Sequence, residues 1–179
     1  MRQRLLALAP FLALMIIIAT IAIYIYEGTG KTGGKARADL APFNVEDRQG
    51  TMRTINPADD YTGDVLVVNF FASWCLPCKA EHPQLVKLSK QQGVTMLGIN
   101  HRKDPEMAEF LDKHGNPYDR VVRDTEGEAA MTFALSGLPE TFVINPEGEL
   151  IYHKAGAVTD KILKSAILPI IRQGTGKAQ

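Results

Sequence analysis

The chain has 179 residues, enough for one ordinary domain and an appended segment. Its 20 Lys and Arg side chains balance its 20 Asp and Glu side chains, so the formal net charge at pH 7 is zero. Because no basic surplus is available to attract a polyanion, we expect no nucleic-acid partner. Apolar residues make up 45% of the chain, an ordinary share for a globular protein, but the first 26 residues hold a disproportionate part of them.

This N-terminal segment predicts a membrane anchor. Residues 5–26 carry no charged side chain, and a helix of this length, at about 1.5 Å per residue, crosses a hydrocarbon core of ~30 Å. Arg2 and Arg4 precede the run and Glu27 follows it, so the positive-inside rule keeps residues 1–4 in the cytoplasm and exports the rest of the chain. A cleaved signal peptide is the alternative. It is disfavoured because its apolar region would span only ~7–15 residues and end at a small-x-small site.

The remaining chain predicts one globular domain on a tether. Residues 27–41 are rich in Gly and Lys and poor in large apolar side chains, which is typical of a flexible linker. We expect the domain to span residues 42–172 and residues 173–179 to form a disordered tail.

The elements expected along the domain alternate between strand and helix. Apolar and β-rich segments predict a hairpin at residues 43–55, a central strand at 65–71, a second buried strand at 94–99 and a strand pair at 141–145 and 150–153. Helical patterns occupy residues 76–92, 105–114, 128–135 and the stretch from 159 or 160 to about 172. This alternation favours an α/β fold with a central mixed sheet flanked by helices.

Two of these helices carry particular expectations. Leu85 and Leu88 are spaced to face the core from the helix at residues 76–92. For the helix at 105–114, we expect Asp104 as N-cap and Pro105 at the first helical position.

The two cysteines of the chain lie between the central strand and the helix that follows it. A C-x-x-C motif at this junction places Cys75 at the helix N-terminus, where about half a positive charge from the helix dipole favours the thiolate. Cys78 follows one turn later, within reach of a disulfide with Cys75. Pro77 lies in the first helical turn, where its missing N–H costs nothing, and we expect Trp74 to flank the reactive sulfur.

The same spacing also occurs in zinc half-sites and in structural disulfides. The chain has no second cysteine pair to complete a zinc site, and closing so short a loop adds little stability. We therefore interpret Cys75 and Cys78 as a redox-active pair and expect no metal and no cofactor. The four histidines are scattered, and we expect no ligand role for His82, His101, His114 or His153.

Two segments carry a resemblance to a known family. Residues 69–78 (NFFASWCLPC), with Pro83 beyond them, resemble the active-site helix of the thioredoxin superfamily, and residues 137–144 resemble the loop that carries its cis-proline. The pattern at four short segments resembles, more narrowly, the DsbE/CcmG thiol:disulfide interchange proteins of cytochrome c maturation; these segments are residues 78–82, 98–100, 115–118 and 139–141. The similarity spans about residues 42–170.

This resemblance implies a thioredoxin-like fold and a thiol:disulfide oxidoreductase of the bacterial periplasm, anchored in the inner membrane. It implies reduction of the disulfide of apocytochrome c, or of a partner thiol protein, before haem attachment. Electrons would come from a membrane thiol-reducing system, because the compartment is oxidising. Two alternatives remain open: a general disulfide oxidase or isomerase, and a copper-binding module.

The resemblance also implies how a substrate is held near the thiols. It predicts a cis bond between Leu138 and Pro139, which turns the Leu138 backbone toward the sulfurs, where an extended substrate could pair with it. It places Glu140 next to this loop. Residues 133–136 (FALS) depart from the family's tyrosine-glycine-valine pattern.

A further departure concerns the proton acceptor. Asn69 occupies the position of the buried aspartate of thioredoxin, so that acceptor is absent. We hypothesise that Glu81 or Glu140 replaces it as the proton acceptor for Cys78, and a carboxylate near a thiol favours a reductant. The alternative is that both glutamates are solvated surface carboxylates.

Overall fold

The computed structural model describes residues 14, 15, 17–20, 40–57, 59–61 and 63–174. The chain divides into two compact units, residues 1–34 and 35–179. Residues 14, 15 and 17–20 of the first unit are helical. Within the described residues, no helix has the length and apolar character needed to cross a membrane. Residues 1–4, most of the predicted anchor at 5–26 and residues 27–39 of the predicted tether lie outside the described part, as do residues 175–179.

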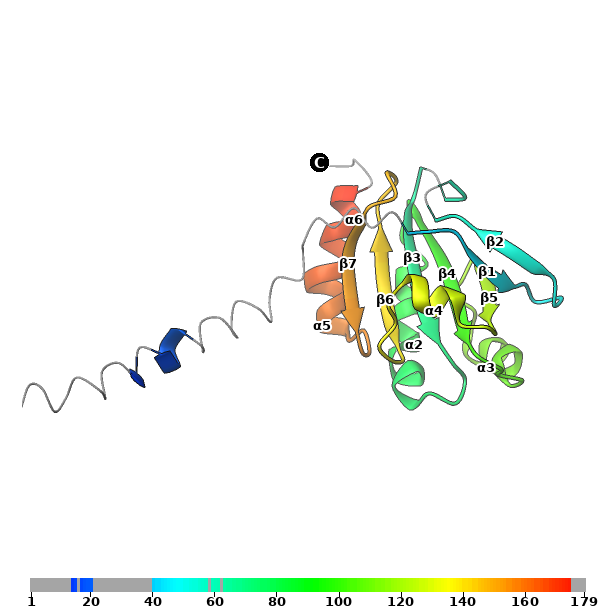
Figure 1. Cartoon of the computed structure of the whole chain (residues 1–179), viewed down its shortest axis with the longest axis horizontal. Coiled ribbons are helices and arrows are strands. Elements are labelled where there is room, and N and C mark those ends of the chain that lie inside the picture. Colours follow the sequence, from blue (N-terminus) through cyan, green and yellow to red (C-terminus); the bar gives the residue numbers. More distant parts are fainter. Residues whose placement is uncertain (1–13, 16, 21–39, 58, 62, 175–179) are drawn as a thin grey trace, which may run out of the picture. The chain divides into compact units, whose positions relative to one another are not determined.

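The second unit is built on one seven-stranded mixed sheet with the order β2-β1-β5-β4-β3-β6-β7 (Figure 1). The strands are β1 (Phe43–Glu46), β2 (Met52–Ile55), β3 (Val65–Phe71), β4 (Val94–His101), β5 (Arg120–Asp124), β6 (Glu140–Ile144) and β7 (Leu150–Ala155). The central strand β3 runs parallel to β4 and antiparallel to β6. The outer pairs β1–β2, β1–β5 and β6–β7 are antiparallel.

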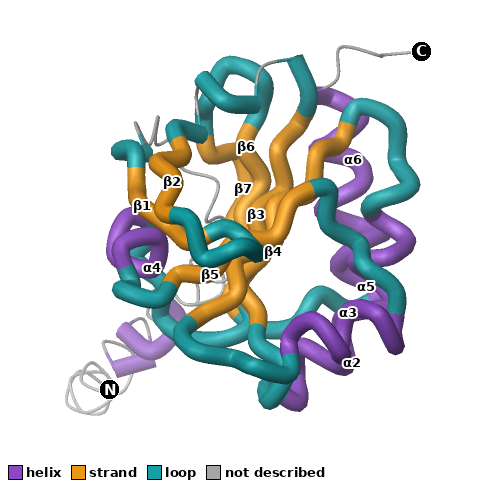
Figure 2. The backbone as a smooth tube through the Cα atoms, turned by 90° about the vertical axis from the view of Figure 1, so that its right-hand side faces the viewer, coloured by secondary structure: helices purple, strands orange, loops and turns teal. Residues whose placement is uncertain are grey.

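Helices cover both faces of this sheet (Figure 2). They are α2 (Leu76–Leu88), α3 (Met107–His114), α4 (Glu128–Thr132), and a C-terminal helix made of α5 (Asp160–Ile162), the π-helical segment η1 (Leu163–Ile167) and α6 (Leu168–Gly174). The residues of α2, α3 and the C-terminal helix pack in one apolar cluster, and those of α4 and the β1–β2 hairpin pack in another. The arrangement confirms the predicted thioredoxin-like α/β fold.

Alternation along β3 assigns its side chains to these two faces. All seven residues of β3 are buried. Val65, Val67 and Phe71 belong to the cluster on the α2 face, whereas Leu66, Val68 and Phe70 belong to the cluster on the α4 face. A strand covered on both sides is the expected result of a nearly continuous apolar run.

Most expected elements are confirmed, with shifts at their ends. Leu85 and Leu88 are buried as predicted. The side chain of Thr159 accepts a hydrogen bond from the Ile162 backbone N–H, so Thr159 is the cap of the last helix. The helix predicted at 128–135 is shorter, because Ala134 turns into the left-handed region at φ 49°.

The predicted start of α3 is wrong. The helix begins at Met107, and Glu106 occupies its N-cap position without a side-chain cap bond. The Asp104 carboxylate does not cap this helix because it accepts hydrogen bonds from Ser73 and Asn100 instead.

Strand β5 has no counterpart among the elements expected from the sequence. Its only apolar residues are Val121 and Val122, and charged residues flank them on both sides, so the segment lacks the apolar pattern of a buried strand.

A close contact between β4 and Tyr118 supports the region behind the cysteines. The Tyr118 ring stacks on Phe71 with 4.9 Å between ring centroids. Its other neighbour is the backbone of β4 at Gly98, where an added Cβ would lie 2.7 Å from the Tyr118 ring carbons. Glycine at this position therefore makes room for the buried ring.

Gly98→Ala is expected to lower the free energy of unfolding by about 1–3 kcal/mol, because the new methyl group must displace a packed aromatic ring. Gly137→Ala is a matched control, since a Cβ at Gly137 meets nothing within 4 Å. Denaturant unfolding of both variants measures the difference. Equal losses of stability would contradict the packing argument.

Candidate active site

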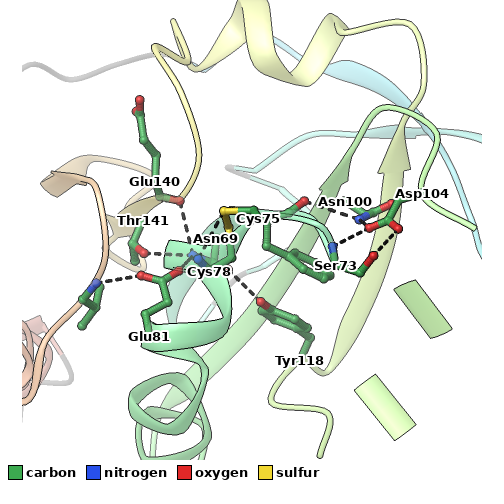
Figure 3. The surroundings of a disulfide bond; sticks show 12 residues. Asn69, Ser73, Cys75, Cys78, Glu81, Asn100, Asp104, Tyr118, Glu140 and Thr141 are labelled. Carbon is green, nitrogen blue, oxygen red and sulfur yellow. Dashed lines mark hydrogen bonds between the residues drawn. A yellow bond between two sulfur atoms is a disulfide. The ribbon is translucent and has the colours of Figure 1, made fainter. Parts of the chain in front are cut away.

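Cys75 and Cys78 lie at the junction between β3 and α2. Cys75, four residues after the end of β3, is the N-cap of the helix, and its sulfur accepts a hydrogen bond from the Cys78 backbone N–H at 3.2 Å. The two sulfurs form a disulfide, with 5.2 Å between the Cα atoms (Figure 3). Pro77 lies in the first turn, as expected. The first cysteine thus sits in the field of the helix N-terminus, which stabilises a thiolate once the bond is reduced.

The disulfide is largely covered but borders an open cavity. Cys75 is 5% exposed and Cys78 is 3% exposed, whereas Trp74 and Leu76 beside them are 60% and 76% exposed. A cavity of about 460 Å³ is lined by Trp74, Cys75, Leu76, Pro77, His101, Arg102, Gly137 and Leu138. Of the two cysteines, Cys75 is the one that lines this cavity, so the cavity gives access to the first cysteine.

The loop before β6 also lines this cavity, through Gly137 and Leu138. The bond between Leu138 and Pro139 is cis, which confirms the predicted geometry. The pairing of β3 with β6 sets Phe70 opposite Glu140, so Pro139 lies beside the end of β3 that leads to Cys75. The Pro139 carbonyl accepts a hydrogen bond from the Gly156 N–H at 2.8 Å, which fixes the loop to the residues after β7.

Glu81 is a buried carboxylate one turn after Cys78 on α2. Its side chain is almost fully removed from solvent and accepts two hydrogen bonds, from the Asn69 amide at 2.9 Å and from the Val158 backbone N–H at 2.7 Å (Figure 3). Burial raises the pKa of the Glu81 carboxyl to about 7, although both hydrogen bonds and the charge of Lys154 oppose this rise. The alternative of a solvated surface glutamate is wrong.

Asn69 is fully buried on β3, behind the disulfide (Figure 3). Its amide nitrogen donates to Glu81 and also approaches the Thr141 hydroxyl at 3.1 Å and the Glu140 carbonyl at 3.4 Å. Its amide oxygen accepts a hydrogen bond from the Tyr118 hydroxyl at 2.7 Å. A residue expected only as the replacement of an aspartate is therefore the centre of a hydrogen-bonded network.

Glu140 is also buried, but its carboxylate faces away from the disulfide (Figure 3). The carboxylate accepts hydrogen bonds from the Ser136 hydroxyl and N–H, from the Gly137 N–H at 3.0 Å, and pairs with His153 at 2.7 Å. Burial acts to raise the pKa of Glu140, but the bonds from Ser136 and His153 outweigh it and hold the pKa below its usual value. For Glu140 too, the surface alternative is wrong.

A second buried network braces the segment that leads to the cysteines. The Asp104 carboxylate accepts hydrogen bonds from the Ser73 N–H at 2.6 Å, from the Ser73 hydroxyl at 2.5 Å and from the Asn100 amide at 2.8 Å (Figure 3). Ser73 is two residues before Cys75, so the Asp104 carboxylate fixes the position of the backbone that leads to the first cysteine. The sequence does not predict these hydrogen bonds, because Asp104 has the sequence context of a helix cap.

The histidines have local partners. His82 bonds to the Gly115 carbonyl at 2.7 Å, and His153 bonds to Glu140. In the part of the chain that the structure describes, no group of three or more His, Cys, Asp or Glu side chains is placed to hold a metal ion.

Comparison with known proteins identifies relatives of this chain. The family model described as Redoxin matches residues 36–167. The thiol:disulfide interchange protein HelX of Rhodobacter capsulatus is 36% identical over 123 residues, which are 68% of this chain and 69% of the relative. The thiol:disulfide interchange protein CycY of Rhizobium leguminosarum is 36% identical over 78% of this chain and 74% of the relative. A solved thiol:disulfide interchange protein from Chlorobium tepidum is 26% identical, with a TM-score of 0.60 over 75% of this chain and 94% of that one.

The burial of Glu81 predicts a pH-dependent stability. Because the folded-state pKa lies above the usual 4.5, the native state binds the proton more tightly than the unfolded chain does. The stabilisation is complete below pH ~4.5 and is lost as the pH rises through about 7, a loss of roughly 3 kcal/mol.

Glu81→Gln is expected to flatten this dependence in denaturant unfolding of the oxidised protein between pH 5 and pH 8. Glu147→Gln, at an exposed turn position, is the matched control and should keep the wild-type slope. An unchanged slope in Glu81→Gln would show that another group carries the pH dependence.

Proposed function

The chain belongs to the Redoxin family and is a thiol:disulfide oxidoreductase, and from this premise we propose that it reduces the disulfide of an apocytochrome c, or of a partner thiol protein, before haem attachment. The observation that carries the proposal is the cysteine pair at the start of α2, with Cys75 lining a cavity and Glu81 buried one turn beyond Cys78. The cytochrome substrate follows from the resemblance at residues 78–82 and 139–141.

In the proposed reaction the reduced enzyme supplies two electrons. The Cys75 thiolate attacks one sulfur of the substrate disulfide and displaces the other as a thiolate, giving a mixed disulfide. Cys78 then loses its proton to Glu81 and attacks the Cys75 sulfur. The second substrate thiolate leaves, and the Cys75–Cys78 disulfide forms. The substrate gains the two electrons that the dithiol loses.

The neighbouring residues are proposed to hold the substrate and tune the pair. Trp74 and Leu138 line the same cavity as Cys75, and an extended segment bound there could pair with the Leu138 backbone next to Pro139. Pro77 pre-sets the first helical turn. Glu140 is proposed to fix the loop rather than to accept a proton, because its carboxylate bonds Ser136, Gly137 and His153.

The surroundings of Cys78 favour a reductant over an oxidant. An ionised carboxylate near a thiol raises the thiol pKa and destabilises its thiolate, which makes the dithiol a better electron donor. Glu81 is one helical turn from Cys78 on the same face of α2, so the two side chains are neighbours. We therefore propose the reductive direction.

The proposed setting is the periplasmic side of a bacterial inner membrane. Residues 5–26 would anchor the chain with residues 1–4 in the cytoplasm. Because the periplasm is oxidising, a membrane thiol-reducing system would have to return the Cys75–Cys78 disulfide to the dithiol after each turnover.

Cys78→Ser tests the substrate. Without the resolving sulfur, the full-length chain is expected to accumulate a mixed disulfide between Cys75 and apocytochrome c, released by dithiothreitol and identified by mass spectrometry. Cys75→Ser is the matched control, which should trap nothing and should abolish c-type cytochromes in cells that lack the wild-type chain. Normal cytochrome levels in that strain would refute the proposal.

The reduction potential separates the reductant from the oxidase. We expect a value near that of thioredoxin, about −270 mV, in a glutathione or dithiothreitol redox titration; a value near about −120 mV would identify an oxidant instead. Tight stoichiometric copper uptake by the reduced protein would favour the copper-binding alternative.

A further inference from the structure

We infer that Tyr118 is a positioning residue for the redox reaction: its hydroxyl fixes the orientation of the buried Asn69 amide, so that the amide donates to Glu81 and keeps this carboxylate able to accept the Cys78 proton. The inference rests on the proposed role of Glu81 as proton acceptor. Tyr118 would thus take part in the reaction although it lies 40 residues from Cys78, the nearer cysteine, in the sequence.

The orientation of the Asn69 side chain is decided by its partners. Asn69 has no exposed surface, so its amide must find its hydrogen bonds within the protein. The Tyr118 hydroxyl donates to the amide oxygen at 2.7 Å, and the amide nitrogen donates to Glu81 at 2.9 Å. The Thr141 hydroxyl can either donate or accept, so it fits both orientations of the amide. The Glu140 carbonyl only accepts, and at 3.4 Å from the amide nitrogen it adds a weaker preference for the same orientation.

Rotation of the amide by half a turn would exchange its two ends. The Asn69 oxygen would then face the Glu81 oxygen, which is repulsive for an ionised carboxylate and favourable only for a protonated one that can donate. The Tyr118 hydroxyl opposes this rotation. Its oxygen could accept from the rotated amide nitrogen, but its own proton would lose the Asn69 oxygen, which is its hydrogen-bond acceptor in the described part of the chain. Tyr118 therefore biases Glu81 toward the ionised form without touching it.

Tyr118 is itself held so that its hydroxyl has little freedom. The ring is clamped between Phe71 and the backbone at Gly98. Its backbone N–H donates to the Asn116 side chain at 3.0 Å. These contacts use the ring and the backbone, not the hydroxyl, so phenylalanine can take the same place and lose only the one hydrogen bond to Asn69.

The other groups that act on Glu81 are few in the described part of the chain. Lys154 on β7 contributes a favourable charge, and the Val158 N–H donates to the second carboxylate oxygen. Cys78 faces it from one turn earlier on α2. None of these contacts the amide oxygen of Asn69, so removal of the Tyr118 hydroxyl isolates the orientation effect.

Tyr118→Phe is the test, made on the full-length chain in detergent. In the oxidised protein we expect the titration midpoint of the Glu81 carboxyl carbon, followed by NMR, to rise by half a pH unit or more. The acid limb of the pH profile of disulfide exchange should move by the same amount, which lowers the rate about threefold at a pH below the midpoint. A merely structural role for Tyr118 would change the melting temperature but neither midpoint.

Tyr61→Phe is the matched control, because this tyrosine packs against the cluster on the α4 face of the sheet. It should leave both midpoints in place. Thr141→Val tests the competing explanation that Thr141 orients the amide, and an upward shift equal to that of Tyr118→Phe would overturn the inference.

The wild-type protein gives a readout that does not depend on a variant folding. If the amide is fixed as inferred, the side-chain N–H resonances of Asn69 form a single set and move with the Glu81 midpoint. Asn69 side-chain resonances that do not shift as Glu81 titrates would refute the inference. None of these measurements needs a cytochrome. If the protein traps apocytochrome c but Tyr118→Phe leaves both midpoints unchanged, the role of Tyr118 is refuted and the proposed function stands.

Discussion

The redox site depends on one buried side chain, the Asn69 amide in the middle of the central strand. Its hydrogen bonds join β3 to α2 through Glu81, to β6 through Thr141 and to the segment before β5 through Tyr118. A fully buried amide has to satisfy its donors and its acceptor inside the protein. These elements are therefore tied to one arrangement directly behind the disulfide.

The two buried glutamates show how environment separates identical side chains. Glu81 accepts two hydrogen bonds, too few to offset burial, and its pKa rises to about 7, near the pH at which it would exchange a proton. Burial acts to raise the pKa of Glu140, but its bonds with Ser136 and His153 outweigh burial and hold the pKa below its usual value. The first can act in proton transfer, while the second is suited to hold the cis-proline loop in place.

Much of this could be predicted from the sequence, because the deciding signals are local. The apolar run of β3, the C-x-x-C motif that follows it and the capping residue of the last helix each identify an element without reference to distant residues. The sequence-based predictions fail where a residue far away in the chain determines the hydrogen bonds of a side chain. Asp104 has the sequence of a helix cap, but Ser73, 31 residues earlier, takes its carboxylate. Likewise, nothing local to Tyr118 indicates that its hydroxyl reaches Asn69.

The opposite roles of Glu81 and Glu140 follow from strand alternation once the register is known. Asn69 pairs with Thr141, and both point to the α2 face of the sheet, where Glu81 lies. Successive side chains of a strand point to opposite faces, so Glu140 must point to the α4 face, as Phe142 does. Its carboxylate therefore cannot share the buried space behind Cys78, although its backbone borders it. The sequence places both glutamates near the cysteines, but only the pairing of β3 with β6 determines which carboxylate lies on the same face of the sheet as Cys78.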